Sequence, residues 1–438
     1  MDQPTWSPPT EHRVMKALNA IHYPVFGGPH NEILRSGALL GRYGWEQLTL
    51  LPDEPGSGVE RLRAAGLEVA QLHLHRLRAK GDPRLHLGLA CKFVPEIQQI
   101  RRLIRELEVD LVRVMGLINP HAGIAARLEG KPVVWQIVDT RSPPALRRAT
   151  TAVARHLADA LLFDGQRVAD LHGAHRFQQP WFTYFPPVDT RLFRPDPERA
   201  SRTRQTLGVP ADARVVGSVS NLNPQKGPEY LIRAAGRILA EIDNVWLLVV
   251  GASYPSHRAL LRRLEAEMVR SHLPRERVIF TGGVSEPQHY YPAMDVKLVT
   301  SPPRSEGTTT TVPEALSCGV PVVATDVGAV SEVIDEGQTG FVVPALDPQA
   351  LAAATLHLLR DEGRRRAMSE LARRAAVERF DVNSYIHTVA QAFEAALSHH
   401  TERSVREPVG SMRSRSVRTP SDAAESASAS RDGQGSRK

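Results

Sequence analysis

Short apolar runs alternate with longer amphipathic segments along most of the chain. In the first half these runs are VMKALNAI (14–21), EQLTLLP (46–52), LEVAQLHL (67–74), DLVRVMGL (110–117), KPVVWQIV (131–138) and DALLFD (159–164). In the second half they are ARVVGSVS (213–220), NVWLLVVG (244–251), RVIFTGG (277–283), DVKLVTS (295–301), GVPVVAT (319–325) and GFVV (340–343). Continuous Val, Ile and Leu runs separated by helical segments are typical of parallel sheets covered on both faces. The two series therefore predict an α/β protein with two Rossmann-like domains.

Changes in composition predict where these domains begin and end. Residues 185–201 carry four prolines and several turn-forming residues, and they mark the seam between the domains. The expected organisation is an N-terminal extension over 1–10, a first domain over 11–186 and a second domain over 187–381. The Ser-, Arg- and Ala-rich stretch 401–438 has almost nothing to bury, so we expect a disordered tail there.

Charge and cysteine content limit the possible functions only coarsely. The 438 residues carry a formal net charge of +7, and the pI is about 9.6. This balance suits nucleotide phosphates, anionic lipid surfaces or nucleic acid, but aromatic residues make up only 5% and no nucleic-acid-binding motif is visible. Cys91 and Cys318 form no disulfide framework or zinc cluster, and Cys318 is expected as a small packing residue. Without a signal peptide or a long apolar run, we expect a cytoplasmic protein whose membrane contact would be peripheral, on the inner face.

The turn SEGTTTTVPEA carries the most specific chemistry. Four threonines, 308–311, precede Pro313, a residue favoured at the first position of a helix, so a helix should begin near 312 or 313. Helix N-termini bind anions, and Glu314 in the first turn can accept hydrogen bonds from a diol such as ribose. Glu306 would lie on the other side of the bound phosphates. Together these groups describe a nucleotide-sugar site; for two glutamates at this spacing alone, a capping carboxylate and a solvated loop charge are the alternative.

The surrounding order of motifs resembles that of retaining glycosyltransferases of family 4, which have the GT-B fold. The resemblance runs through VVGSVSNLNPQKGPEYLIRAAGRIL (215–239), VIFTGGVSEPQHYYPAMDVKLVTS (278–301) and the E-x7-E turn followed by ALSCGVPVVATDVGAVSEVI (315–334). It is weaker in the first half. It implies two Rossmann-like domains facing a central cleft, with a C-terminal helix at about 382–400 returning to the first domain. It also implies a nucleotide diphosphate sugar, such as a UDP- or GDP-sugar, as co-substrate, an unidentified hydroxyl acceptor and no metal.

The resemblance assigns roles to positions in the second domain. Lys226 matches the lysine that neutralises the donor diphosphate, Glu314 the residue that holds the ribose, and Glu306 the one that contacts the donor sugar. The family usually has an arginine five or six residues before the lysine, where this chain has Asn221, so Arg304 is the candidate for the missing charge, or else a solvated arginine. The remaining donor-site candidates in this domain are turn residues: Thr308, Thr309 and Thr310 beside the sugar and phosphates, and Gly283 and Val284 beside the base.

The first domain offers fewer matches. Gly27 and Gly28 resemble the glycine pair whose backbone approaches the donor phosphates. Asp139 is the candidate for a polar catalytic group near the acceptor, with a turn or cap aspartate as the alternative. His121 lies on the cleft side by position, although a lone histidine is more often structural. His73 and His75 share a strand face, but we expect no metal because no carboxylate or further histidine partner is evident.

The reaction that the resemblance implies is sugar transfer from a nucleotide diphosphate to an acceptor hydroxyl, with retention at the anomeric carbon. The acceptor could be a glycan, a glycolipid or a small molecule. A phosphorylase or an epimerase on the same fold is one alternative. A nucleotide-sugar-binding protein without transfer activity is another, suggested by Asn221 and by Val138, which stands where the family often has a histidine.

Overall fold

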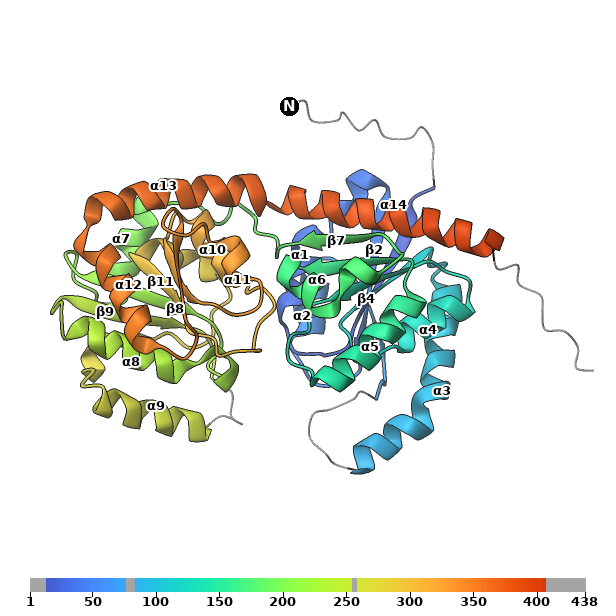
Figure 1. Ribbon diagram of the computed structural model, residues 1–438, viewed down its shortest axis with the longest axis horizontal. Helices are drawn as coiled ribbons and strands as arrows, with labels where there is room; N and C mark the ends of the chain where they lie inside the picture. The colour runs from blue at the N-terminus through green and yellow to red at the C-terminus, as the bar shows by residue number, and fades with distance from the viewer. Residues whose placement is uncertain (1–12, 76–82, 254–257, 407–438) are drawn as a thin grey trace, which may run out of the picture. The chain divides into compact units, whose positions relative to one another are not determined.

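The computed structural model describes residues 13–75, 83–253 and 258–406, and its first half forms a parallel sheet (Figure 1). The strand order is β3-β2-β1-β4-β5-β6-β7, so the order reverses between β1 and β4. Ligands bind at such a switch point in parallel α/β sheets. The strands are β1 (Met15–Ile21), β2 (Trp45–Pro52), β3 (Glu68–Leu72), β4 (Leu111–Met115), β5 (Val133–Ile137), β6 (Ala160–Asp164) and β7 (Trp181–Tyr184).

The second half forms a second parallel sheet, with the order β10-β9-β8-β11-β12-β13. Its switch point lies between β8 and β11, by the same rule. The strands are β8 (Arg214–Val219), β9 (Val245–Val250), β10 (Val278–Phe280), β11 (Val296–Val299), β12 (Val322–Thr325) and β13 (Gly340–Val343). The prediction of two parallel sheets is confirmed. Strand β7 was not predicted, because WFTY is too short and too polar in its surroundings to be distinguished from a loop.

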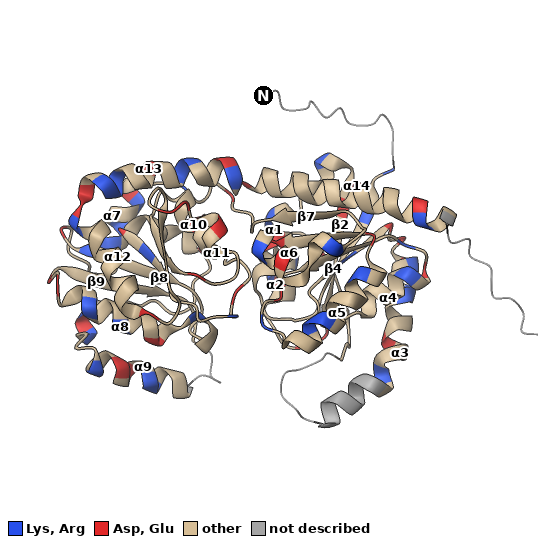
Figure 2. Ribbon diagram, viewed as in Figure 1, with Lys and Arg blue, Asp and Glu red and all other residues tan. Residues whose placement is uncertain are grey.

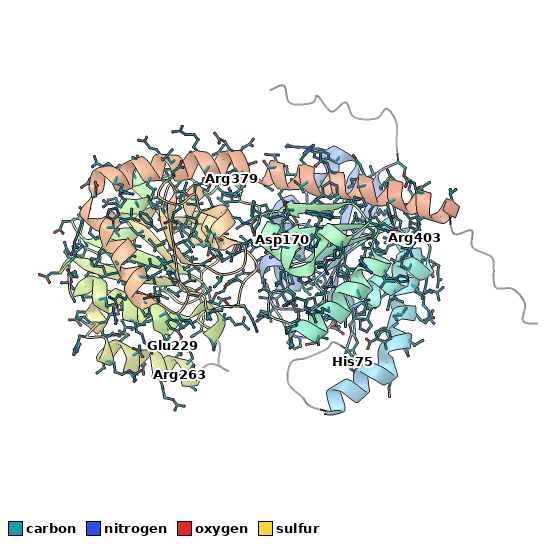
Figure 3. All side chains as sticks on the ribbon, viewed as in Figure 1. His75, Asp170, Glu229, Arg263, Arg379 and Arg403 are labelled. Carbon is teal, nitrogen blue, oxygen red and sulfur yellow. The ribbon has the colours of Figure 1, made fainter. Side chains whose placement is uncertain are left out.

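Helices connect the strands and cover both faces of each sheet. In the first half they are α1 (Gly28–Ser36), α2 (Gly58–Ala64), α3 (Pro83–Glu106), α4 (His121–Leu128), α5 (Pro144–Leu157) and α6 (Gln166–His172). In the second half they are α7 (Pro197–Thr206), α8 (Pro228–Leu239), α9 (Arg258–Arg270), α10 (Thr311–Ser317), α11 (Val330–Val333), α12 (Pro348–Arg360) and α13 (Glu362–Arg379). Glu229 and Arg263, labelled in Figure 3, join α8 to α9 through a 3.2 Å ion pair. The apolar side chains of α8, α9 and α12 pack together on one face of the second sheet.

Helix α14 (Val382–Arg406) returns to the first sheet, as predicted (Figure 1). Phe393 packs edge-on against Trp45 of β2, with the ring centroids 4.9 Å apart. The Tyr385 hydroxyl donates to Glu32 of α1 at 3.0 Å, which satisfies one oxygen of that buried carboxylate. Apolar burial and a buried hydrogen bond together hold the helix to the first domain.

The ends of the chain differ from expectation in one respect. Residues 401–406 continue helix α14, so the tail predicted from residue 401 is wrong over these six positions. The helix can continue because 401–406, TERSVR, contains one glutamate and two arginines, which favour helices, and no glycine or proline. The extension predicted at 1–10 and the remainder of the predicted tail lie outside the described residues.

Surface charges of both signs alternate along several helices. Figure 2 shows Lys and Arg interspersed with Asp and Glu on α9 and α13, in agreement with their sequences. A nucleic-acid-binding face would instead concentrate one sign of charge. Among the described residues, no helix is both long enough and apolar enough to cross a membrane.

Candidate functional site

One cavity of about 760 Å³ is lined by turns that follow strands of both sheets. From the first domain it takes the loop after β1, the start of α1 and the start of α2. From the second it takes the turns after β8, β9 and β10 and the start of α10. Of the predicted site residues, the cavity is lined by Gly27, Gly28, Asn221, Lys226, Gly283, Val284, Thr309, Thr310 and Glu314. The turns that carry these residues therefore meet at one cavity.

Lys226 and Glu306 form an ion pair at this cavity. Lys226 ends a short helical turn after β8, and its ammonium donates to Glu306 Oε1. Ser301 Oγ donates to the same carboxylate oxygen at 2.9 Å. Gly227 follows the lysine with φ of 59°, and an added Cβ would lie 2.1 Å from the carbonyl oxygen of Thr300. Only glycine fits this turn, which fixes the direction of the lysine.

Glu314 lies in the first turn of α10 and is 3% exposed. Its Oε1 pairs with the guanidinium of Arg35 from α1, and its Oε2 accepts a hydrogen bond from Tyr291 at 2.5 Å. Arg35 also donates to the Pro187 carbonyl at 2.5 Å. The helix begins at Thr311, close to the predicted start, so the carboxylate is held at the helix entrance as expected. Its pairing with Arg35 was not foreseen.

The loop before α10 is held from both domains. Asp164 Oδ2, at the end of β6, accepts the Thr308 N–H at 2.6 Å. Thr140 Oγ1 donates to the Glu306 carbonyl at 2.7 Å. On the other side, the Ala329 N–H donates to the Gly307 carbonyl at 2.8 Å. Thr308 therefore faces Asp164, whereas Thr309 and Thr310 line the cavity.

Asp164 is a site residue that sequence reasoning missed. It is 4% exposed, and its Oδ1 has no hydrogen-bond partner among the described residues. Burial, together with the nearby Glu32 and Glu306 carboxylates, raises the pKa of Asp164 well above its usual range. The one available signal was its place at the carboxyl end of a predicted strand.

Lys297 is a second unexpected buried ionisable group. It stands in the central strand β11 of the second sheet and is 1% exposed. Burial lowers its pKa to about 7, and the nearby Lys226 acts in the same direction. The apolar run DVKLVTS had indicated only a strand at this position.

Arg304, Asp139 and Asn221 differ in the structure from the roles expected of them. Arg304 has φ of 61° and an exposed side chain, and it is not among the described residues that line the cavity. Asp139 Oδ1 accepts the N–H groups of Arg141 and Ser142 at 3.1 and 3.3 Å, which is the geometry of a turn aspartate. Asn221 lines the cavity, but its Oδ1 accepts the Ala252 N–H at 3.2 Å. Its side chain is therefore engaged in holding the neighbouring loop.

The histidines of the first domain have a carboxylate partner, which the sequence analysis wrongly judged absent. His75, labelled in Figure 3, lies with its Nδ1 2.5 Å from Glu96 Oε1, and His121 Nε2 is 3.4 Å from Glu96 Oε2. Burial lowers the pKa of His121, which favours its neutral form. Glu96 comes from α3, twenty-one residues beyond His75, so local spacing gave no sign of it. Among the described residues no group of ligands suited to a metal ion is present.

Comparison with known proteins finds similarity over part of the chain. Residues 200–375 match the family model Glycosyl transferases group 1. The chain is similar to the D-inositol 3-phosphate glycosyltransferase of Corynebacterium urealyticum, with 32% identity over 242 residues, which cover 53% of this chain and 56% of that protein. It is also 29% identical over 300 residues to the GDP-mannose-dependent alpha-(1-6)-phosphatidylinositol monomannoside mannosyltransferase of Mycolicibacterium smegmatis, covering 64% of this chain and 75% of that protein. The chain thus spans little more than half the length of the Corynebacterium relative.

Solved structures agree on the fold. HepE of Anabaena in complex with UDP superposes with a TM-score of 0.72 and 23% identity, covering 87% of this chain and 100% of that chain. A glycosyltransferase from Rickettsia africae superposes with a TM-score of 0.73 and 16% identity, covering 88% of this chain and 99% of that chain. The chain therefore has the GT-B fold, and its residues 200–375 match the family model Glycosyl transferases group 1.

Proposed function

We propose that this protein is a glycosyltransferase of family 4 that transfers a sugar with retention from a nucleotide diphosphate to an acceptor hydroxyl. One observation carries the proposal: a single cavity gathers Lys226, Glu314 and the threonine turn from separate strand ends, with Glu306 paired to Lys226 beside it. A lysine, a diol acceptor and backbone N–H groups at one cavity match the chemistry of a nucleotide sugar.

Each group has a distinct role in the proposed donor complex. Glu314 would accept hydrogen bonds from the ribose diol, and Lys226 would leave Glu306 to face the diphosphate. Glu306, released from the lysine, would contact hydroxyls of the donor sugar. The Anabaena protein binds UDP and the Mycolicibacterium relative is named for GDP-mannose, which supports a UDP- or GDP-sugar as the donor here.

The reaction breaks the bond between the anomeric carbon and the phosphate oxygen and forms one between that carbon and the acceptor oxygen. The acceptor proton passes to an oxygen of the leaving phosphate. Negative charge grows on the diphosphate as it leaves, so the Lys226 ammonium and the backbone N–H groups at the cavity stabilise the transition state more than the ground state. This mechanism uses no metal ion.

For the acceptor, we propose only its chemical class. It is a hydroxyl on a glycan, a glycolipid or a small molecule, and it would bind on the first-domain side of the cavity. We place the protein in the cytoplasm, with peripheral contact to anionic membrane. Two of the relatives act, by name, on inositol-containing acceptors, which supports a polyol or lipid-linked acceptor.

The test is release of nucleotide diphosphate from a panel of UDP-, GDP-, ADP- and dTDP-sugars. Wild-type protein is compared with Glu306→Ala and Lys226→Ala, and Glu370→Gln on the exposed side of α13 is the matched surface control. We expect release from one donor, an activity that falls about 10²-fold or more in both site variants and is unchanged in the control. Equal release by Lys226→Ala and wild type would refute the assigned role.

Binding of the same nucleotides, followed by calorimetry, separates the alternatives. A donor that binds without being cleaved, even with sugar acceptors and polyols present, would favour the non-catalytic protein. Transfer of the sugar to inorganic phosphate would favour a phosphorylase. The absence of binding to every nucleotide would contradict the proposal as a whole.

A further inference from the structure

The cations that line the cavity do not all have a carboxylate partner among the described residues. Lys226 is paired with Glu306, and Arg35 is paired with Glu314. Arg61, on α2, also lines the cavity, but no acidic partner lies within ion-pairing distance of it among residues 13–75, 83–253 and 258–406. The walls therefore present one arginine whose charge no carboxylate of the described chain neutralises.

Contacts within the first domain hold Arg61 in place. Its guanidinium carbon lies 4.6 Å from the ring centroid of Phe26, in the loop after β1. Stacking on an aromatic ring orients a guanidinium and leaves its N–H edge available to a ligand. The Gly58 N–H donates to the Pro24 carbonyl at 2.9 Å, which ties the start of α2 to the same loop.

The tie between these two loops is close. A Cβ added at Gly56 would lie 2.4 Å from the Pro24 carbonyl oxygen, so the backbones pass too near each other for a side chain. Phe26 and Arg61 therefore come from two segments that are packed as one unit. An arginine on such a support loses less conformational entropy on binding than a free surface arginine.

Among the described residues, the part of the cavity wall that the second domain forms has no cation besides Lys226. Position 221 is asparagine, which carries no charge, and its amide oxygen is engaged with the Ala252 N–H. Arg304, the candidate replacement from sequence, does not line the cavity among the described residues. Lys226 is then the one cation of the second domain on the described wall, and a diphosphate carries more than one negative charge.

We propose that Arg61 supplies the second positive charge that binds the donor diphosphate, from the first domain rather than from position 221. The inference rests on the proposed function. The guanidinium would donate two N–H groups to phosphoryl oxygens, a geometry that arginine makes well. As the anomeric carbon–oxygen bond breaks, the charge left on the diphosphate would be shared between Arg61 and Lys226.

The experiment compares binding of nucleoside diphosphates and monophosphates by calorimetry. UDP, GDP, UMP and GMP are titrated into wild type, Arg61→Gln and Arg61→Lys. The matched control is Arg63→Gln, an exposed arginine on the same helix that does not line the cavity. We expect Arg61→Gln to weaken diphosphate binding about 10- to 100-fold and monophosphate binding much less. Arg61→Lys should retain part of the affinity, and the control should bind as wild type.

A compensating variant sharpens the test. Asn221→Arg places an arginine where the family usually has one, and in the Arg61→Gln background it should restore most of the lost diphosphate affinity. Unchanged diphosphate affinity in Arg61→Gln would overturn the inference. So would an equal loss of diphosphate and monophosphate affinity, because such a loss would not depend on the second phosphate.

The same measurements distinguish an error in the role of Arg61 from an error in the proposed function. If wild type binds no nucleotide at all, the proposed function fails. If wild type binds and cleaves a donor and Arg61→Gln does so equally, only the role of Arg61 is lost.

Discussion

The two halves of the molecule contribute to the site in different ways. In the second domain, the site residues belong to turns that directly follow strands, and Lys226 and Glu306 pair with each other across only 80 positions. In the first domain, Arg35 and Asp164 act on residues 279 and 144 positions away. The second domain thus carries a site that local sequence patterns describe. The first domain completes it through contacts that depend on the folded chain.

The sharpest test of this difference is at Gly307, where the two halves meet. A Cβ there would lie 2.5 Å from Asp164 Oδ2 and 3.1 Å from the Val138 carbonyl oxygen. Gly307→Ala should therefore displace Glu306, the preceding residue, and lower kcat/KM about 10²-fold, the usual cost of misplacing a site group by about 1 Å. Donor turnover under steady-state conditions measures the effect.

Two further variants show whether the first domain causes the loss. Asp164→Ser in the Gly307→Ala background removes the contacting carboxylate and should recover part of the activity. Gly41→Ala has nothing within 4 Å of the added Cβ and should behave as wild type. A fully active Gly307→Ala enzyme would mean that the loop does not need the support of the first domain.

The sequence predicted the second domain well because its information is local. Each of its strands was expected from an apolar run, and the helix after the threonine turn began within two residues of the predicted start. Glu314 was placed at a helix start because proline marks helix starts wherever it occurs, and Lys226 was assigned through the resemblance of its Lys-Gly turn to that of the family. Such signals act over a few residues and need no knowledge of the fold.

The first domain contains contacts that local sequence patterns do not predict. Nothing near Arg35 or Asp164 in sequence indicates a partner in the other domain, because either could be an ordinary surface charge. The same holds for Glu96, whose contacts with His75 and His121 depend on the packing of α3. Asp139 illustrates the opposite case, since its position suggested chemistry and its hydrogen bonds are those of a turn.

A smaller effect is expected at Arg35, which tests whether the first domain supports Glu314 or competes with the donor for it. Arg35→Gln removes the charge beside the buried Glu314 carboxylate and leaves the hydrogen bond that Tyr291 donates to its other oxygen. A buried carboxylate that has lost its cation is displaced more readily, so donor affinity should fall about tenfold. Titration of the donor nucleotide against both proteins measures this, with kcat reported separately.

The opposite result would be equally informative. Tighter nucleotide binding by Arg35→Gln would mean that the arginine occupies the carboxylate and must leave before the ribose can bind. In that case the first domain restrains the site of the second domain.

The smallest effect concerns the protonation of Asp164. Its pKa is raised by burial, so the folded protein holds the proton more tightly than the unfolded chain does. The stability that this carboxyl contributes is full below its unfolded pKa of about 3.9 and is lost as the pH rises through the folded pKa. Asp164→Asn cannot ionise, and its amide oxygen can still accept the Thr308 N–H. The variant should therefore be more stable than wild type at pH 8, by about 1 kcal/mol, and the gain should shrink at pH 5.

Urea unfolding at pH 8 and pH 5 measures this difference, and Asp159, measured at pH 8 and also near pH 4, provides a control of the opposite sign. Burial favours the neutral form of Asp159, but hydrogen bonding from His400 and the charge of Arg127 outweigh it and lower its pKa. Asp159→Asn should therefore cost more stability at pH 8 than near pH 4, because the contribution of a carboxylate with a lowered pKa disappears as the pH falls. If Asp164→Asn destabilised the protein equally at both pH values, the ionised carboxylate would be the form that holds Thr308. The contact between the domains would then be a charge-assisted hydrogen bond, and the first domain would hold the donor-side loop more strongly than a neutral acid can.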